Sequence, residues 1–194
     1  MPLEIVQAGH PVLRQQARPL EVAEIASKEI RKLIQQMRET MHEAPGVGLA
    51  APQIGLSLQL AVIEDRSEYQ KDLPPEQLAE RERFPVPFHA IINPRILELN
   101  EEGVDFFEGC LSVAGFSAVV PRARTVRVEC LNERGKPRVI KASGWYARIL
   151  QHEIDHLHGT LYIDRMRSRS FSSMDNWVQY MKGKPMREIR SAFD

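Results

Sequence analysis

The sequence predicts an α+β fold in which antiparallel β-sheets pack around one central helix. The helix is expected between Ser143 and Gly159, because Ser143 or Gly144 can cap its start, Gly159 can end it and no proline interrupts it. Apolar side chains lie on both faces of this helix, so both faces should be buried. Strands are expected around it, since apolar and charged side chains alternate over residues 125–131 as in a half-buried strand.

The composition is that of an ordinary globular domain. Its 194 residues, 43% hydrophobic and 27% charged, can bury a core without covalent supports. A formal net charge of zero argues against binding to nucleic acid through bulk charge. Two cysteines fit a reducing compartment. No apolar run approaches the ~20 residues of a membrane span, and the start has no secretory or transit character. We therefore expect a cytoplasmic protein without membrane contact, with an organelle, after loss of a presequence, as the alternative.

The first 43 residues are expected to form an arm and a long helix. Residues 3–20 contain His10-Pro11 and Arg18-Pro19, which favour an extended arm packed on the body. Residues 21–43 are predicted to form one amphipathic helix, because apolar residues recur at helical spacing. These residues are Ala26, Ile30, Leu33, Ile34, Met37 and Met41. The methionines are interpreted as core residues rather than as the lining of a ligand groove.

A glycine-rich segment follows at residues 46–55. Gly46 and Gly48 would indicate a phosphate site only between a strand and a helix, whereas here a helix precedes them and Pro52 follows. We interpret them as positions where the backbone closely approaches a substrate. From the residue type alone, Gln53 is interpreted as a surface glutamine.

The remaining strands are expected to be short. A charged, proline-bearing stretch at residues 66–87 is interpreted as a surface excursion with a helical turn near residues 76–83, and no chemistry is assigned to it. Cys130 falls on the apolar side of its strand and is interpreted as a buried structural thiol. Pro94 is expected to separate two strands. The strands are predicted at residues 58–63, 90–93, 96–99, 119–120, 125–131 and 139–140.

Candidate chemistry is concentrated in the central helix. His152 and His156 lie four residues apart, so their imidazoles project from the same helix face within reach of one cation. Glu153 borders this face and can contact a water on that cation without being a ligand, as in metal-assisted hydrolysis. Asp155 is expected to support the ligands or to pair with a buried cation, with an exposed carboxylate as the alternative. His158 is interpreted as a charge near the helix C-terminus rather than as a ligand.

A third ligand is needed, because a catalytic metal of this kind has three protein ligands and one open position for water. Cys110 is the best candidate, since it follows Gly109, which permits close approach, and lies between strands rather than within an alternating pattern. Two alternatives are a zinc peptidase, which shares the His-Glu-x-x-His spacing, and a metal-stapled binding module, which would need a fourth ligand. Cysteine as the third ligand, together with Gln53, argues against the peptidase, and the presence of only three plausible ligands argues against the binding module.

Three motifs occur in an order that is typical of a known family. In chain order they are Gly46-Val47-Gly48-Leu49-Ala50-Ala51-Pro52-Gln53, Glu108-Gly109-Cys110-Leu111-Ser112 and Gln151-His152-Glu153-Ile154-Asp155-His156. With Gly9-His10-Pro11 and Ile92-Asn93-Pro94, they resemble the peptide deformylases over most of the chain. Two departures are Ala114, where the family often has proline, and Trp145, where many members have leucine. Both features resemble a branch that includes organellar deformylases.

The resemblance implies a peptide deformylase-like fold and removal of the formyl group from the N-terminal formylmethionine of new polypeptides. It implies that the metal ligands are Cys110, His152 and His156. Glu153 would be the general acid and base that takes a proton from the attacking water and returns it to the departing amine. The Gln53 amide and the Leu111 backbone N–H would stabilise the oxyanion.

The expected cofactor is one divalent metal ion. By ligand preference a Cys/His/His set suits zinc and would also hold iron(II). The resemblance favours Fe2+ natively, with Zn2+, Ni2+ or Co2+ as occupants in a preparation. Because thiolate and ferrous iron both oxidise, activity is expected to decay in air.

A pocket for the methionine side chain is predicted, since an unbranched thioether needs an apolar slot. Its walls would be Val47, Phe106, Trp145 and Ile149, with Gly48 and Gly109 beside the substrate. The alternative for Trp145 is a plain core residue.

The chain is expected to divide into a single catalytic domain, residues 1–170, and a C-terminal extension, residues 171–194, packed on the body or on a partner. Trp177 and Tyr180 could dock on the same chain or on a second copy, so monomer and homodimer both stay open. The basic residues of the extension could make weak ribosome contact, with a solvated charged tail as the alternative. The expected partners are otherwise N-formylmethionyl nascent peptides.

Overall fold

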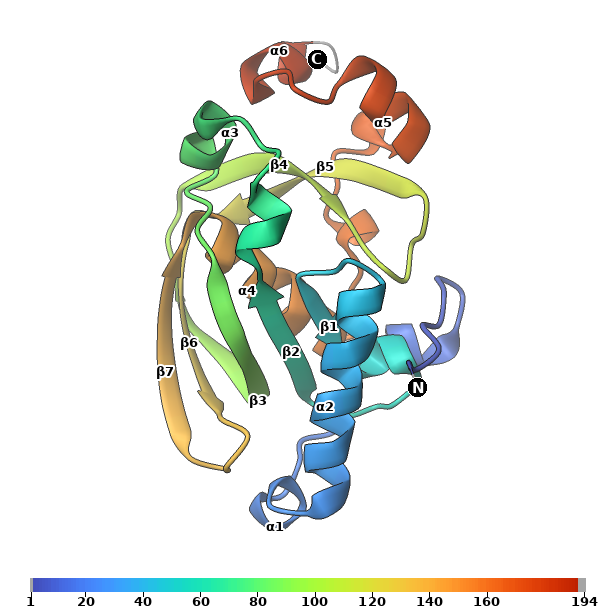
Figure 1. Cartoon of the computed structure of the whole chain (residues 1–194), viewed down its shortest axis with the longest axis vertical. Helices are drawn as coiled ribbons and strands as arrows, with labels where there is room; N and C mark the ends of the chain where they lie inside the picture. The colour runs from blue at the N-terminus through green and yellow to red at the C-terminus, as the bar shows by residue number, and fades with distance from the viewer. Residues whose placement is uncertain (1, 192–194) are drawn as a thin grey trace.

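The structure is a computed structural model that describes residues 2–191 (Figure 1). Its helices are α1 Val22–Ile25, α2 Lys28–Glu43, α3 Pro75–Glu80, α4 Gly144–Leu157, α5 Met174–Tyr180 and α6 Met186–Ser191. Its strands are β1 Gly48–Ala50, β2 Leu60–Asp65, β3 Val86–Leu99, β4 Gly103–Gly109, β5 Phe116–Ala123, β6 Thr125–Leu131, β7 Pro137–Ser143 and β8 Ser172–Ser173. Single 3-10 turns lie at Pro11–Arg14, Ala51–Ile54, Ser67–Gln70, Tyr162–Asp164 and Ser168–Ser170.

The strands form two antiparallel sheets around α4. The larger sheet has the order β1-β2-β3-β6-β7, and the smaller has the order β4-β5-β8. α4 contacts both sheets: Leu150 and Ile154 lie in the core of the larger sheet, while Arg148 and Gln151 donate to β5 carbonyls at 2.8 and 2.9 Å. The predicted α+β class with a central helix is therefore what the chain forms.

The larger sheet is covered by helices on both faces. Along β2, Leu60 and Val62 pack with α2, whereas Ala61 and Ile63 pack with α4. Because successive strand residues point to opposite faces, a strand covered on both sides must be apolar at every position. This burial explains why β2 has no alternating pattern, whereas β6, which is covered on one face, alternates.

The predicted helix at residues 21–43 is two helices. Ser27 separates α1 from α2, and its Oγ accepts from the Ile30 N–H at 3.2 Å, which makes it the N-cap of α2. The single-helix prediction was wrong because apolar spacing continues through the break. The methionine prediction is confirmed, since Met37 and Met41 are fully buried.

The two strands predicted on either side of Pro94 are one strand, β3. The register with β6 shifts between Ile92 and Arg95, which marks a bulge where proline needs no ladder hydrogen bond. Asn93 takes a left-handed φ of 49° there, and its side chain donates to the Leu20 carbonyl and accepts from the Leu20 N–H, both at 2.8 Å. Proline therefore bends the strand here without ending it.

The N-terminal arm packs on the body, as predicted. The Ala8 N–H donates to the Ser112 carbonyl at 2.7 Å, and the Ala17 N–H donates to the Leu157 carbonyl at 2.9 Å. The arm thus contacts both the loop after Cys110 and the end of α4, so it frames the region between them.

The C-terminal segment, residues 171–191, lies over the smaller sheet, where α5 and α6 are the outermost elements beside β4 and β5 (Figure 1). β8 pairs with β5, and the Trp177 ring packs edge-on against Phe107 at 6.1 Å. Asp105 in β4 accepts from Arg190 at 2.8 Å, which ties α6 to the sheet. This segment therefore covers the face of β4 that points away from α4.

Candidate metal centre and active site

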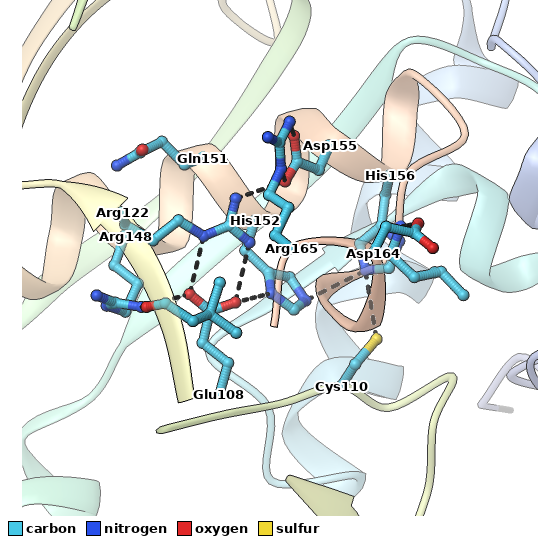
Figure 2. Close-up of polar contacts among 12 residues, drawn as sticks. Glu108, Cys110, Arg122, Arg148, Gln151, His152, Asp155, His156, Asp164 and Arg165 are labelled. Atoms are coloured by element: carbon cyan, nitrogen blue, oxygen red, sulfur yellow. Dashed lines mark hydrogen bonds and ion pairs between the residues drawn. The ribbon is translucent and has the colours of Figure 1, made fainter. Parts of the chain in front are cut away.

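α4 and the end of β4 bring the three predicted ligands together. The His152 and His156 Nε2 atoms lie 3.2 Å apart, and Cys110 Sγ lies 3.3 Å from His156 Nε2. All three ligand atoms lie within 4.8 Å of one another. Among residues 2–191 they are also the one group of this kind with metal-binding spacing. Figure 2 shows Cys110 pointing toward the imidazoles.

The spacing of these atoms fits a single divalent ion. A tetrahedral ion with ordinary bond lengths separates two nitrogen ligands by about 3.4 Å and a nitrogen from a sulfur by about 3.6 Å. The observed 3.2 and 3.3 Å lie close to those values. A thiolate with two imidazoles is also a donor set that zinc and iron(II) accept.

Glu108 orients His152. The His152 Nδ1–H donates to Glu108 Oε2 at 3.0 Å, which holds the ring with Nε2 directed toward the other ligand atoms. Glu108 is the first residue of the motif that contains Cys110. The same short segment of chain therefore supplies one ligand and holds another.

Two arginines neutralise the buried Glu108 carboxylate (Figure 2). Arg122 donates to both carboxylate oxygens at 2.9 Å, and Arg148 donates to Oε1 at 2.7 Å. Burial alone would raise the pKa of Glu108, but the hydrogen bond from His152 and the charge of Arg122 outweigh it and hold that pKa well below its usual range. The carboxylate therefore stays ionised and accepts the hydrogen bond from the His152 Nδ1–H.

Asp155 extends this network. It accepts from Arg122 and from Arg165, whose Nη2 lies 2.7 Å from Asp155 Oδ1. The expectation that Asp155 pairs with a cation is confirmed, and its exposed alternative is excluded. His158 Nδ1 lies 2.8 Å from the Ile154 carbonyl at the end of α4, away from the ligands, as predicted.

Glu153 is buried beside the ligands, and its position depends on Gly48. A Cβ on residue 48 would lie 2.1 Å from Glu153 Oε1, so only glycine leaves room for this carboxyl. Burial raises the pKa of Glu153 to about 7. Its Oε2 is a buried oxygen without a hydrogen-bond partner among residues 2–191, as expected of a group that serves a bound species.

Gln53 is buried, so its interpretation as a surface glutamine was wrong. The 3-10 turn after β1 directs its side chain inward, where it is 1% exposed. Its Oε1 accepts from the Ala50 N–H at 2.9 Å, and its Nε2 lies 3.4 Å from Cys110 Sγ and 3.3 Å from Ser112 Oγ. Accepting from Ala50 fixes the orientation of the amide, so its N–H groups point toward the ligands.

A cavity of about 560 Å³ opens in front of Cys110, His152 and Glu153, whereas His156 lies behind this lining. Most predicted site residues line it, namely Val47, Gly48, Gln53, Gly109, Cys110, Leu111, Trp145, Ile149, His152 and Glu153. Phe107, Glu108 and Arg148 line it as well, together with the loop of residues 113–116 and Met174. The cavity thus joins segments that are distant in sequence, between Ala44 and Met174.

Phe106 does not line this cavity, which corrects the predicted pocket. Its ring packs edge-on against Trp145 at 6.2 Å, and the Arg148 guanidinium lies 5.3 Å from its centre. Trp145 and Arg148 therefore stand between Phe106 and the cavity, and its neighbour Phe107 takes the lining position. Trp145 and Arg148 of α4 thus determine that Phe107, rather than Phe106, lines the cavity.

The excursion at residues 66–87 supports the cavity wall, although the sequence assigned it no chemistry. The Arg81 and Arg83 guanidiniums lie 5.1 and 5.2 Å from the Trp145 ring, within cation–π distance. Burial lowers the pKa of Arg81. An arginine-rich stretch normally indicates a solvated surface, so no signal in the sequence distinguished these two.

Within residues 2–191 the helices are all too short or too polar to cross a bilayer.

Comparisons with known proteins point in one direction. A family model described as polypeptide deformylase matches residues 2–172. The chain is 47% identical over 173 residues to the chloroplastic peptide deformylase 1A of Solanum lycopersicum, covering 89% of this chain and 62% of that protein. It is 42% identical over 170 residues to the mitochondrial peptide deformylase of Homo sapiens, with coverage of 88% and 70%. Bacterial peptide deformylases, such as peptide deformylase 3 of Streptomyces avermitilis at 47% identity, are similar too.

The chain thus spans slightly less than two thirds of the length of the plant relatives. Among solved structures, it resembles a peptide deformylase from Synechococcus elongatus in complex with actinonin, with 37% identity, a TM-score of 0.72 and coverage of 87% and 80%. It also resembles a Met-Ala-Ser-bound class I type b peptide deformylase from Acinetobacter baumannii, with 32% identity, a TM-score of 0.76 and coverage of 86% and 99%.

Proposed function

This chain belongs to the peptide deformylase family, and from that premise we propose that it removes the formyl group from the N-terminal formylmethionine of newly made polypeptides and releases formate. The observation that carries the proposal is the convergence of one thiol and two imidazoles within 4.8 Å, beside a buried carboxyl and at a cavity. The family implies a divalent metal at such a site.

Cys110, His152 and His156 would hold that ion. When bound, it supplies the positive charge that makes water a better nucleophile and a carbonyl a better electrophile. Fe2+ is proposed as the native ion, with Zn2+, Ni2+ or Co2+ as occupants in a preparation. The donor set accepts all of them, because thiolate and imidazole bind the later first-row metals well.

Glu153 is proposed as the general base and then the general acid. It takes a proton from the attacking water and returns it to the amine nitrogen as the C–N bond breaks. Its place beside the ligands, with one oxygen free of partners among the described residues, supports this role. Gly48 contributes by leaving the space that the carboxyl occupies.

The oxyanion is proposed to accept hydrogen bonds from the Gln53 amide and the Leu111 backbone N–H. Donors fixed before the reaction stabilise developing charge without a cost of reorganisation. The Gln53 amide meets this condition, because Ala50 fixes its carbonyl and its Nε2 already lies beside Cys110.

Val47, Trp145 and Ile149 are proposed as the walls for the methionine side chain, with Gly48 and Gly109 beside the peptide. All five line the cavity. Phe106 supports the wall from behind Trp145 rather than contacting the substrate.

The deciding test is formate release from formyl-Met-Ala by the metal-loaded chain and by Glu153→Ala, with metal content measured for both. Losing the proton-transfer group should lower kcat by about 10²–10⁴-fold while metal content stays the same. Glu133→Ala, which changes an exposed carboxylate, is the matched control. Internal cleavage of unformylated peptides without formate release would instead favour the peptidase alternative, and a loaded chain that releases no formate would refute the proposal.

A further inference from the structure

Four charged side chains connect the surface of the molecule to the proposed metal ligand His152 (Figure 2). They are Arg165, Asp155, Arg122 and Glu108, here called the Arg165 network. Arg165 donates to both oxygens of Asp155, from Nε at 2.6 Å and from Nη2 at 2.7 Å. Asp155 also accepts from Arg122, which donates in addition to both oxygens of Glu108. Glu108 accepts from the His152 Nδ1–H, so the network ends at a ligand atom's own ring.

The outer end of the Arg165 network is open to solvent, whereas its inner end is buried. The side chain of Arg165 is 49% exposed, that of Asp155 12% and that of Arg122 3%. These three side chains also line a cavity of about 290 Å³. Among the described residues, its lining has no member in common with that of the catalytic cavity. A small solute can therefore reach Asp155 without entering the catalytic cavity.

Arg122 lies between two buried carboxylates, and Arg165 reduces the demand on it. A buried carboxylate needs a paired cation, because the interior solvates its charge poorly. Arg165 gives Asp155 a bidentate partner, the geometry in which a guanidinium binds a carboxylate best. Without Arg165, the cation still paired with Asp155 among the described residues would be Arg122. Arg122 would then be drawn toward Asp155 and away from Glu108.

We propose that Arg165 is a positioning residue of the metal centre. By holding Asp155, it lets Arg122 stay with Glu108. Glu108 then keeps the His152 imidazole in the orientation that binds the ion. The inference rests on the metal centre of the proposed function, and it adds a residue that lies outside the three motifs by which that centre was found.

The test compares the full-length wild-type chain with Arg165→Met. Affinities for Zn2+ and for Co2+ are measured by competition with a chromophoric chelator. Loss of a group that supports a metal-binding histidine costs about 10–100-fold in affinity, so Arg165→Met, which acts through other side chains, should cost about tenfold. The visible absorption bands of the Co2+ complex should shift as well, because they depend on coordination geometry. Arg165→Lys, which keeps the charge without the bidentate fork, should lose less affinity than Arg165→Met.

Arg167→Met is the matched control. The Arg167 side chain is 57% exposed and pairs with a buried carboxylate, Asp105, which has a second arginine partner in Arg190. Both variants thus leave a buried aspartate with one cation, so both should lower Tm by a similar amount. Only Arg165→Met should change the metal affinity and the Co2+ spectrum. Equal losses of affinity in the two variants would overturn the inference, because they would mean general loosening of the fold.

Guanidinium ion provides a second test, because the cavity of about 290 Å³ beside Asp155 can admit it. At a low, non-denaturing concentration it should restore most of the affinity that Arg165→Met loses and leave Arg167→Met unchanged. Sodium chloride at the same ionic strength is the control for screening. Failure of guanidinium to restore the affinity, or equal recovery with sodium chloride, would overturn the inference. Wild-type affinity in Arg165→Met before any addition would overturn it too.

The two proposals fail in different ways. If the wild-type chain binds the ions and releases no formate from formyl-Met-Ala, the proposed function is lost, and the affinities still decide the role of Arg165. If it releases formate and Arg165→Met binds the ions as tightly as the wild type, only the inference about Arg165 is lost. If the wild-type chain binds neither ion, the proposed metal centre and the inference are both overturned.

Discussion

Single atoms decide whether the site can form. Gly48 is the sharpest case, because the space that a side chain would take is already occupied by the Glu153 carboxyl. The glycine was interpreted from the sequence as a place of close approach, and the structure identifies what approaches. That neighbour is a side chain of the same protein, and Gly48 also lines the cavity where the peptide is proposed to bind.

Gly48→Ala should displace Glu153 and lower kcat by about 100-fold, since a shift of about 1 Å in a reacting group costs that much. Metal content should not change. Gly103→Ala is the matched control, because a Cβ at Gly103 meets no atom within 4 Å. Formate release by both variants measures the effect, and full activity in Gly48→Ala would show that Glu153 does not need its present position.

Trp145 is the second residue whose role can be isolated. Trp145→Ala should lower the preference for formyl-Met-Ala over formyl-Ala-Ala by about tenfold, because it removes an apolar wall from the cavity. Trp145→Leu should keep most of the preference. The measurement is the ratio of the two kcat/KM values. An unchanged ratio in Trp145→Ala would assign the indole to the core, where Phe106, Arg81 and Arg83 contact it.

Residue types in the sequence predicted the metal ligands more directly than they predicted the residues that surround those ligands. Two histidines at helical spacing admit few interpretations, so His152 and His156 were found directly. Gln53 was not, because a glutamine amide is as common on a surface as in a site, and only its fold environment distinguishes the two. Arg122 also gives no local signal, since its partners Glu108 and Asp155 are distant in sequence.

At the level of elements, β4 was missed because it buries charge. β4 contains Asp105 and Glu108, both buried and both paired with arginines, so its sequence does not alternate between apolar and polar residues. β6 does alternate and was predicted with its observed limits. Alternation of apolar and polar residues therefore predicts a strand when one face is exposed to solvent. It does not predict a strand in which buried ion pairs replace apolar contacts.

The bulge in β3 provides a test at this level. Asn93→Ala should lower the free energy of unfolding by about 2–3 kcal/mol, because two hydrogen bonds to Leu20 are lost and alanine resists a left-handed φ. Asn93→Gly should cost less, since glycine accepts that φ. Denaturant unfolding of the three proteins measures the difference. Equal losses in both variants would mean that backbone strain contributes nothing.

At the level of the whole molecule, the C-terminal segment completes the smaller sheet. Trp177, Met186 and Ile189 pack with Phe107 and Val119. The sequence placed an extension here without indicating which surface it covers, because that pairing depends on contacts between distant parts of the chain. Its division from a catalytic domain at residue 170 stays a prediction.

A chain that ends after Ser170 should unfold at a Tm about 5–10 °C lower, because the truncation exposes several apolar side chains and each kcal/mol is worth about 2–4 °C at this size. Val178→Ala, which changes an exposed side chain of the same segment, should leave Tm nearly unchanged. Thermal unfolding followed by circular dichroism measures both. An unaltered Tm would mean that the segment does not stabilise the body. Light scattering on the same samples tests whether the segment holds a dimer together.

The position of Glu108 has a consequence for how the centre is assembled. Glu108 lies two residues before Cys110 and accepts a hydrogen bond from the imidazole of His152. This contact joins the end of β4 to α4 through protein groups alone. Folding therefore sets the coordination geometry before any ion arrives. Exchange of one divalent ion for another should then be limited by release of the first ion and binding of the second, without a change in the conformation of the chain.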